Sequence, residues 1–160
     1  MSIVDLRSDT VTRPTPAMRR AMMEAAARAA GSDLGIVGVT VLTSHTPESY
    51  GRAVGRERVT VMDEVGRLAG EALGSGLKGI VCSPLEVATV RAAAGPDAWI
   101  VVPGIRRPGD AVGDQARTAG PAEAVRAGAT HLVVGRPVLQ AEDPRGAFLV
   151  MAEAAQNARR

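Results

Sequence analysis

The sequence predicts an α/β fold built on a parallel β-sheet. Short, unbroken apolar runs alternate along the chain with amphipathic helical stretches, and continuous hydrophobicity is typical of strands that are covered on both faces. The 160 residues are 46% hydrophobic and 22% charged, which suits one soluble globular domain. Parallel strands in such a domain are joined by right-handed crossovers through helices.

Four apolar runs are the predicted strands, and each is rich in β-branched residues and bounded by glycine, serine or proline. They span residues 36–42, 79–82, 99–102 and 132–134. A complete eight-stranded barrel needs about 200 residues or more. Because four strands leave two raw edges, we expect either a small open α/β sandwich or two chains that pair their half-sheets.

Five helices are predicted around these strands. They span residues 15–29, 59–75, 85–94, 121–127 and 144–157. The first has a face of small apolar residues, and the second repeats apolar residues at a spacing of three and four. The third and fifth follow a capping residue and a proline, Ser83-Pro84 and Asp143-Pro144, whereas the fourth begins at Pro121. Proline is favoured at a first helical position because no backbone N–H is needed there.

Composition excludes several functional classes. The formal net charge is only +2 and three residues are aromatic, so no nucleic-acid surface is expected. A single cysteine, Cys82, permits no internal disulfide, and with the distant His45 and His131 it lacks metal-ligand spacing. No apolar run has the length of a membrane span, and charged residues interrupt any signal-peptide core. We therefore expect a reduced, cytoplasmic protein without a metal.

Two arginines follow predicted strands at the edge of the sheet where ligands usually bind in parallel α/β folds. Arg106 comes after the third strand and Arg136 after the fourth, with Gly104 and Gly135 close by in the sequence. Planar guanidinium groups on neighbouring strand ends suit an anion, above all a phosphate. The long loop 103–120 is expected to cover a ligand; the alternative is a solvated loop with surface arginines.

Two further residues near strand ends have simpler interpretations. His45 follows Ser44 at the same rim, where it is either a ligand contact or, more simply, a bystander. Cys82 ends the second predicted strand, and we expect it to be a small buried hydrophobe.

Several of these strand ends resemble the second half of orotidine 5′-phosphate decarboxylase. The matching motifs are Val39-Thr40-Val41-Leu42-Thr43-Ser44, Gly79-Ile80-Val81-Cys82-Ser83-Pro84, Pro103-Gly104-Ile105-Arg106 followed by Gly113-Asp114-Gln115, and Val133-Val134-Gly135-Arg136-Pro137. The resemblance covers roughly residues 22–160. It implies half of a (β/α)8 TIM barrel, strands five to eight, formed by residues 23–160.

The resemblance also implies which residues meet a nucleotide. In the family, a threonine and a serine that end the fifth strand approach the pyrimidine ring. An arginine and a glutamine contact the nucleotide, the glutamine near its phosphate, and a glycine–arginine pair grips the phosphate. By motif match these six positions are Thr43, Ser44, Arg106, Gln115, Gly135 and Arg136. The implied ligand is orotidine or uridine 5′-phosphate, bound weakly if at all.

The same resemblance implies that the catalytic machinery is missing from this chain. The family's cofactor-free chemistry resembles electrostatic and proton-delivery catalysis by an Asp–Lys–Asp–Lys network on the first three barrel strands. The single lysine, Lys78, precedes the second predicted strand, at the opposite end from the expected site. We expect no catalytic residue here and negligible decarboxylation by the chain alone. Two alternatives are activity with a complementary N-terminal half, and a structural role as a homodimer of half-barrels.

The first 22 residues resemble a different family, the low-specificity threonine aldolases. The likeness lies in Asp5-Leu6-Arg7-Ser8-Asp9-Thr10-Val11-Thr12-Arg13-Pro14-Thr15, where Ser8 matches a serine that contacts the substrate carboxylate. The lysine that binds pyridoxal phosphate in that family has no counterpart, so we expect neither cofactor nor aldolase activity. The sequence thus predicts a chimera of a leader, residues 1–22, and a half-barrel, with Ile3 to Leu6 as a candidate fifth strand.

Overall fold

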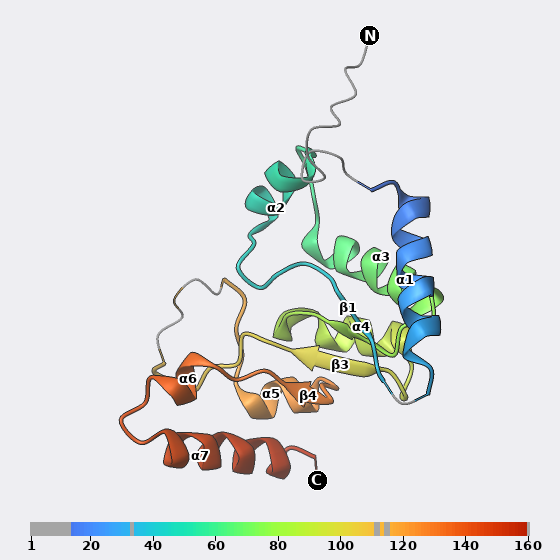
Figure 1. The fold of residues 1–160 in the computed structure, drawn as a ribbon. Coiled ribbons are helices and arrows are strands. Elements are labelled where there is room, and N and C mark those ends of the chain that lie inside the picture. The colour runs from blue at the N-terminus through green and yellow to red at the C-terminus, as the bar shows by residue number, and fades with distance from the viewer. Residues whose placement is uncertain (1–13, 33, 111–112, 114–115, 160) are drawn as a thin grey trace.

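A single parallel sheet organises the protein, whose computed structural model describes residues 14–32, 34–110, 113 and 116–159 (Figure 1). In spatial order the strands are β1 Val37–Val39, β2 Gly79–Val81, β3 Trp99–Val102 and β4 His131–Leu132. Each pairs in parallel with the next along the chain, which confirms the α/β class and the strand order. β1 is shorter than predicted: after Val39, the Thr40 hydroxyl turns onto the Val81 carbonyl at 2.8 Å.

Helices connect the strands and cover the sheet. They are α1 Pro16–Ala30, α2 Pro47–Val54, α3 Val61–Gly74, α4 Val87–Ala94 preceded by the 3-10 helix η1 Pro84–Glu86, α5 Pro121–Arg126, α6 Arg136–Leu139 and α7 Pro144–Asn157. The five predicted helices are confirmed to within a few residues. Figure 1 shows α1 at one end of the molecule beside α3, and α7 at the other end beside α5.

Two helices, α2 and α6, were not predicted from the sequence. The start of α2 is a capping box, in which the Thr46 hydroxyl accepts from Ser49 N at 3.2 Å and the Ser49 hydroxyl accepts from Thr46 N at 2.9 Å. Its end is Gly55, whose φ of 71° is left-handed and favours glycine. These signals stand in the sequence, but the eight-residue span carries too short an apolar stripe to be recognised.

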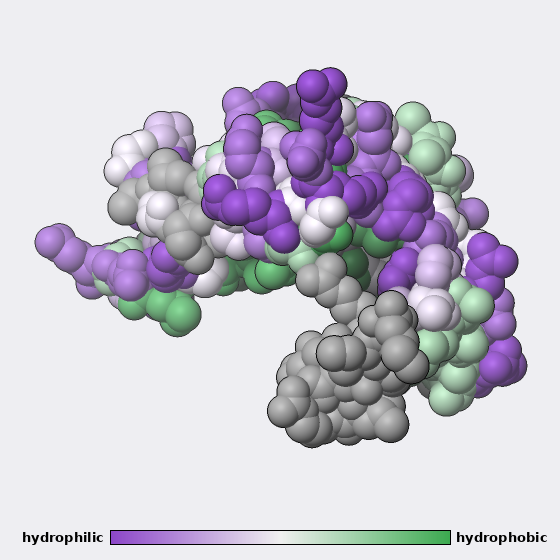
Figure 2. All heavy atoms as spheres, turned by 90° about the horizontal axis from the view of Figure 1, so that it is seen from above, coloured by the Kyte–Doolittle hydropathy of each residue, from purple (hydrophilic) through white to green (hydrophobic). Residues whose placement is uncertain are grey.

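The two faces of the sheet have different surroundings. Gly38, Ile80 and Ile100 are aligned across three strands, and the two isoleucines are fully buried in the core with residues of α3 and α4. Residues that alternate with them are more open, and Val39 is 59% exposed. The molecule is hollowed on one side, with apolar residues visible along the hollow (Figure 2). The described sheet is therefore packed by helices mainly on one face.

A buried carboxylate fixes α2 to α3. Glu64 is 5% exposed and pairs with Arg56 at 2.7 Å and with Arg67 at 2.5 Å, while the Tyr50 hydroxyl donates to it at 3.3 Å. The hydrogen bond from Arg67, followed by that from Arg56, outweighs desolvation and lowers the Glu64 pKa to about 2. This cluster holds α2 in place beyond the end of β1.

Lys78 and His131 lie at the amino-terminal ends of strands, as the sequence predicts. The Lys78 amide donates to the Ile36 carbonyl at 2.8 Å directly before β2. The His131 ring packs against Trp99, the first residue of β3, with 5.3 Å between the ring centroids and an angle of 54° between the ring planes. No helix of the described residues is long and apolar enough to cross a bilayer.

Candidate functional site

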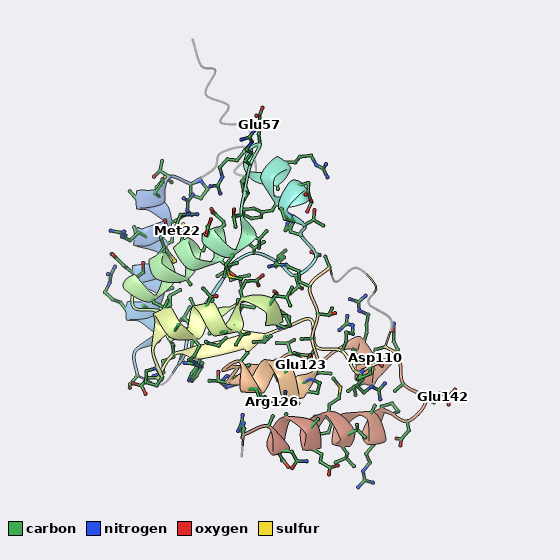
Figure 3. The ribbon with its side chains drawn as sticks, turned by 180° about the vertical axis from the view of Figure 1, so that it is seen from behind. Met22, Glu57, Asp110, Glu123, Arg126 and Glu142 are labelled. Atoms are coloured by element: carbon green, nitrogen blue, oxygen red, sulfur yellow. The ribbon has the colours of Figure 1, made fainter. Side chains whose placement is uncertain are left out.

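The two arginines predicted to share a rim do meet in one cavity. It has a volume of about 260 Å³ and lies at the carboxyl-terminal end of the sheet. Its lining residues are Arg106, Arg107, Gly109, Asp110, Arg136, Pro137, Gln140 and Ala141. The cavity thus joins the loop after β3 to the start of α6, and Asp110 lies beside α6 when the molecule is seen from behind (Figure 3).

Backbone geometry brings Arg136 against the long loop. A Cβ atom placed on Gly113 would lie 2.8 Å from Nη1 of Arg136, and Gly113 has a φ of +62°. The left-handed φ favours glycine at this position, and an added methyl group would displace the end of the Arg136 side chain. Arg136 itself follows Gly135, which is the residue before the first turn of α6. The loop after β3 and the loop after β4 therefore approach each other through an arginine and a glycine.

A neighbouring pair, which the sequence interpretation missed, closes the turn beside this cavity. Arg107 Nη2 donates to Asp110 Oδ1 at 2.9 Å, and the Arg107 amide donates to Asp110 Oδ2 at 2.7 Å. The hydrogen bond from Arg107 lowers the Asp110 pKa below its usual range. Arg107 Nη2 also reaches the Pro137 carbonyl at 3.4 Å. Because its charge is neutralised by Asp110, Arg107 shapes the cavity wall more than it adds positive charge.

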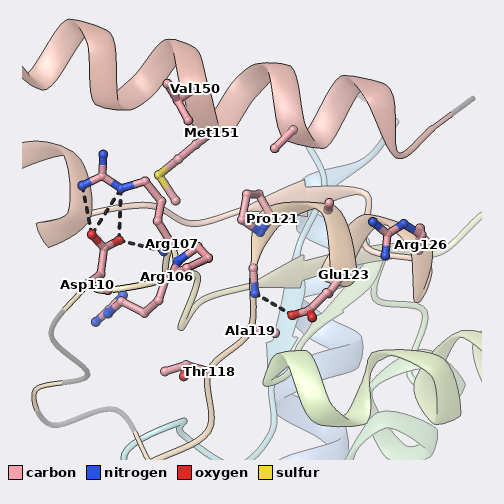
Figure 4. Close-up of a pocket in the computed structure, with 15 residues that line it drawn as sticks. Arg106, Arg107, Asp110, Thr118, Ala119, Pro121, Glu123, Arg126, Val150 and Met151 are labelled. Atoms are coloured by element: carbon pink, nitrogen blue, oxygen red, sulfur yellow. Dashed lines mark hydrogen bonds and ion pairs between the residues drawn. The ribbon is translucent and has the colours of Figure 1, made fainter.

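A larger cavity of about 970 Å³ adjoins the first and shares Arg106 and Arg107 with it (Figure 4). It runs between the loop after β3, α5 and α7, with Val150 and Met151 on one side and Arg126 at one end. Glu123, in the first turn of α5, caps the start of that helix by accepting from the Gly120 amide at 2.9 Å. Arg136 does not line it, so the smaller cavity is the one that matches the predicted phosphate position.

Thr43 and Ser44, in the segment that follows β1, lie on the other side of the loop. Thr43 is buried, its carbonyl accepts from the Ala116 amide at 3.1 Å, and its methyl group would lie 3.4 Å from a Cβ placed on Gly104. Ser44 is exposed. Thr43 therefore adjoins the segment that leads to Arg106, but neither Thr43 nor Ser44 lines the arginine cavity.

His45 has local partners that do not require a ligand. Its Nδ1 lies 3.0 Å from the Ser49 hydroxyl, and its ring meets Tyr50 edge-on at 5.8 Å. Both partners belong to α2, so the structure favours the bystander interpretation. Gln115, like Ser8 and the candidate strand from Ile3 to Leu6, lies outside the described residues.

A buried ionic cluster beneath the rim was also missed from the sequence. Arg117 Nη1 donates to Glu86 Oε1 at 2.5 Å, and its Nη2 donates to the Val41 and Leu42 carbonyls at 3.1 and 2.9 Å. Ser83 donates to the other Glu86 oxygen. Arg117 is 8% exposed and Glu86 3%. A guanidinium and a carboxylate 31 residues apart give no local sequence pattern, so only the fold brings them together.

Cys82 lies next to this cluster and is 1% exposed. Burial, with a smaller contribution from the Glu86 charge, raises the pKa of its thiol to about 12. The prediction of a small buried hydrophobe is confirmed, because a thiol with such a pKa stays protonated at neutral pH.

Comparison with known proteins identifies the origin of this arrangement. The family model for the orotidine 5′-phosphate decarboxylase / HUMPS family matches residues 5–149. The chain belongs to this family. An orotidine 5′-phosphate decarboxylase of Anaeromyxobacter sp. (strain K) is 52% identical over 134 residues, 82% of this chain and 57% of the relative. One from Rhodopseudomonas palustris (strain BisB5) is 49% identical over 136 residues.

Solved structures of the family confirm the half-barrel. A crystal structure of orotidine 5′-phosphate decarboxylase from Lactobacillus acidophilus superposes with a TM-score of 0.70 at 31% identity, over 88% of this chain and 60% of that one. One from Sulfolobus solfataricus, 17% identical with a TM-score of 0.57, shares the fold. The chain spans a little over half the length of the curated relatives it matches. The family match begins at residue 5 and therefore includes residues 5–22, which the sequence resemblance assigned to an aldolase-like leader. No comparison supports that second origin, which stays a prediction.

Proposed function

We propose that this chain forms the phosphate- and nucleotide-binding half of a site of the orotidine 5′-phosphate decarboxylase type. The observation that carries the proposal is the cavity shared by Arg106 and Arg136. Two guanidinium groups from consecutive βα loops match the charge and the several acceptor oxygens of a phosphate monoester. The expected ligand is the 5′-phosphate of a pyrimidine nucleoside, such as uridine or orotidine 5′-phosphate.

Each predicted site residue has a role in this proposal. Arg106 and Arg136 neutralise the phosphate, and Gly135 lets the backbone come close to it. The family resemblance assigns Thr43 and Ser44, in the segment that follows β1, to the pyrimidine side. Gln115, which lies outside the described residues, is assigned to the phosphate by the family resemblance alone. In enzymes, binding energy from a remote group such as this phosphate is used to hold the reacting part of the substrate in place.

The chain by itself supplies no acid for decarboxylation in this proposal. Replacing the departing carboxylate by hydrogen requires a proton at the ring carbon, and a lysine ammonium is suited to deliver it. Lys78 is the single lysine and it precedes β2, at the amino-terminal end of the strands. Arginines at the rim hold their protons too tightly to serve as acids. Decarboxylation therefore requires a complementary half that brings an Asp–Lys network.

Calorimetric titration with uridine 5′-phosphate tests the binding proposal. The wild-type chain should bind, and Arg136→Ala should weaken binding beyond detection. Arg126→Ala is the matched control, because Arg126 lines only the larger cavity and its loss should change the affinity less than twofold. Unchanged affinity in Arg136→Ala, or equal losses in both variants, would contradict the assignment of the phosphate to the smaller cavity.

The activity proposal has its own experiment. The chain is mixed with a separately produced N-terminal half of a family relative, and the loss of orotidine 5′-phosphate absorbance is followed. We expect no rate above background from the chain alone and a measurable rate from the mixture. A rate from the chain alone would contradict the proposed dependence on a second half.

A second candidate role is structural, as a homodimer of half-barrels. It is favoured by the edge positions of β1 and β4 in the described sheet and by the exposure of Val39 and Val133, at 59% and 50%. A two-fold axis along the barrel would place β4 of each copy beside β1 of the other in the parallel sense. Light scattering after size exclusion tests it: a folded monomer at micromolar concentration would exclude this role.

The chimeric origin of the chain belongs to the proposal as well. We take residues 1–22 to be an aldolase-like leader that contributes nothing to nucleotide binding. Ser8→Ala should then leave the affinity for uridine 5′-phosphate unchanged. A loss of affinity in this variant would show that the leader takes part in the site.

A further inference from the structure

Arg117 connects the two sides of the proposed nucleotide site. On one side, its Nη2 holds the carbonyls of Val41 and Leu42 at 3.1 and 2.9 Å, and these residues directly precede Thr43. The Ala116 amide next to it donates to the Thr43 carbonyl at 3.1 Å. Three hydrogen bonds from two consecutive residues therefore fix residues 41–43, in the segment after β1 that carries the pyrimidine-side residues.

The same segment holds the phosphate side. Ala119 pairs with Ile105 in a parallel bridge, and its carbonyl accepts from the Arg106 amide at 3.0 Å. The Gly104 carbonyl accepts from the Ala119 amide at 3.4 Å. Residues 116–119 thus run between the segment that follows β1 and the segment that follows β3. A shift of this segment would change the separation between Thr43 and Arg106.

The chemistry of Arg117 suits a positioning role better than a purely stabilising one. Its pair with Glu86 is almost fully buried, and removing two charges from water offsets much of the attraction between them. The buried pair fixes the orientation of the Arg117 side chain. Its planar guanidinium binds acceptors in the segment after β1 and on η1 in one geometry. A lysine ammonium can keep the charge but not this fork.

We propose that Arg117 is a positioning residue that sets the distance between the pyrimidine side and the phosphate side of the site. The inference rests on the proposed nucleotide-binding function. Replacing Arg117 should therefore lower the affinity for ligands that contact both sides at once. Ligands that touch only the phosphate side do not depend on the alignment.

The experiment compares two ligands in two variants. Uridine 5′-phosphate spans both sides, whereas ribose 5-phosphate lacks the pyrimidine. Arg117→Lys should weaken uridine 5′-phosphate about tenfold, the effect of losing one or two charge-assisted hydrogen bonds. It should change ribose 5-phosphate less than twofold. Arg91→Lys is the matched control, because Arg91 also binds carbonyls, those of Gly95 and Gly128, at 2.6 and 2.9 Å. It should leave both affinities unchanged.

A double-mutant cycle between Arg117 and Thr43 distinguishes the positioning role from a general loss of stability. Thr43→Ala should weaken uridine 5′-phosphate in the wild-type background and have a smaller effect in the Arg117→Lys background, because Thr43 is already displaced there. Thermal unfolding of each variant verifies that it is folded. Should Arg117→Lys lack a cooperative transition, Glu86→Gln replaces it and must give the same split between the two ligands.

The outcomes separate this inference from the proposed function. If the wild-type chain binds neither ligand, the proposed function fails and the inference fails with it. If the wild type binds but Arg117→Lys weakens both ligands equally, or neither, the positioning role alone is overturned. Additive effects of Thr43→Ala and Arg117→Lys would overturn it as well.

Discussion

The Arg136 guanidinium lies directly against the backbone of Gly113, so that a methyl group on Gly113 would come within 2.8 Å of Nη1. This contact ties the loop after β3 to the loop after β4. A side chain on Gly113 would therefore displace the end of Arg136, which lines the proposed phosphate site.

Gly113→Ala should therefore displace Arg136 and weaken uridine 5′-phosphate about tenfold, which calorimetry measures directly. The matched control is Gly95→Ala, outside the cavity. Gly95 also has a left-handed φ, 74° against 62°, but a Cβ there meets nothing within 4 Å. Both variants carry backbone strain, and only Gly113→Ala carries the clash. Equal affinities in the two variants would contradict the role of the contact.

Glu64 makes stability depend on pH in the acid range. Its pKa is lowered from the usual 4.5 to about 2 in the folded chain, first by the hydrogen bond from Arg67. A lowered folded-state pKa stabilises the fold above pH 4.5, and this contribution is lost as the pH falls from 4.5 toward 2. The full shift corresponds to at most about 3 kcal/mol, and because both arginines are nearly half exposed we expect about 2 kcal/mol.

Glu64→Gln should thus lower the free energy of unfolding by about 2 kcal/mol at pH 7 and flatten its dependence on pH below 4.5. Urea unfolding at several pH values measures both effects. Asp63→Asn is the control, since Asp63 is an exposed acid in the same first turn of α3. If Asp63→Asn reproduced the loss, the cause would be the helix dipole rather than the buried cluster.

Cys82 should be unreactive in the native protein. The thiol is 1% exposed and its pKa is raised to about 12, and the thiolate is the form that reacts with alkylating agents and disulfides. Labelling with a chromogenic disulfide reagent at pH 8 should be negligible without denaturant and complete in concentrated urea. Rapid native labelling would show that the loop above Cys82 opens frequently.

Gly38 allows α3 to approach β1 closely. A Cβ atom on Gly38 would lie 2.6 Å from that of Ala72 in α3, so Gly38→Ala should destabilise the protein by about 1 to 3 kcal/mol. Gly70→Ala in α3 is the contrasting variant, since a Cβ there meets nothing within 4 Å. It should stabilise the helix by about 0.5 to 1 kcal/mol. Thermal or urea unfolding compares the two, and a stabilised Gly38→Ala would refute the close packing.

The regular part of this fold is readable from the sequence because each strand and its crossover helix has a local signature. The runs around Ile80 and Ile100 are buried and continuous, and helices such as α7 begin at a cap followed by proline. The convergence of Arg106 and Arg136 was also predictable, because parallel strands end at one edge. These features depend only on sequence periodicity and on topology.

The remaining site features depend on contacts between distant residues. Arg117 and Glu86 meet only after two βα units have formed. Arg107 is distinguished from Arg106 by its ion pair with Asp110, which the loop brings back onto it. No periodicity distinguishes a buried arginine from a surface one. The position of Gly113 against Arg136 likewise depends on the conformation of a loop that carries no repeating pattern.

Trp99 is the single tryptophan, and it lies against His131 at the amino-terminal end of the strands, across the sheet's length from both arginines. Its fluorescence therefore reports on the integrity of the β2–β3–β4 core and is remote from any ligand at the opposite end. The protein thus carries an optical probe of its scaffold that is separate from its candidate site.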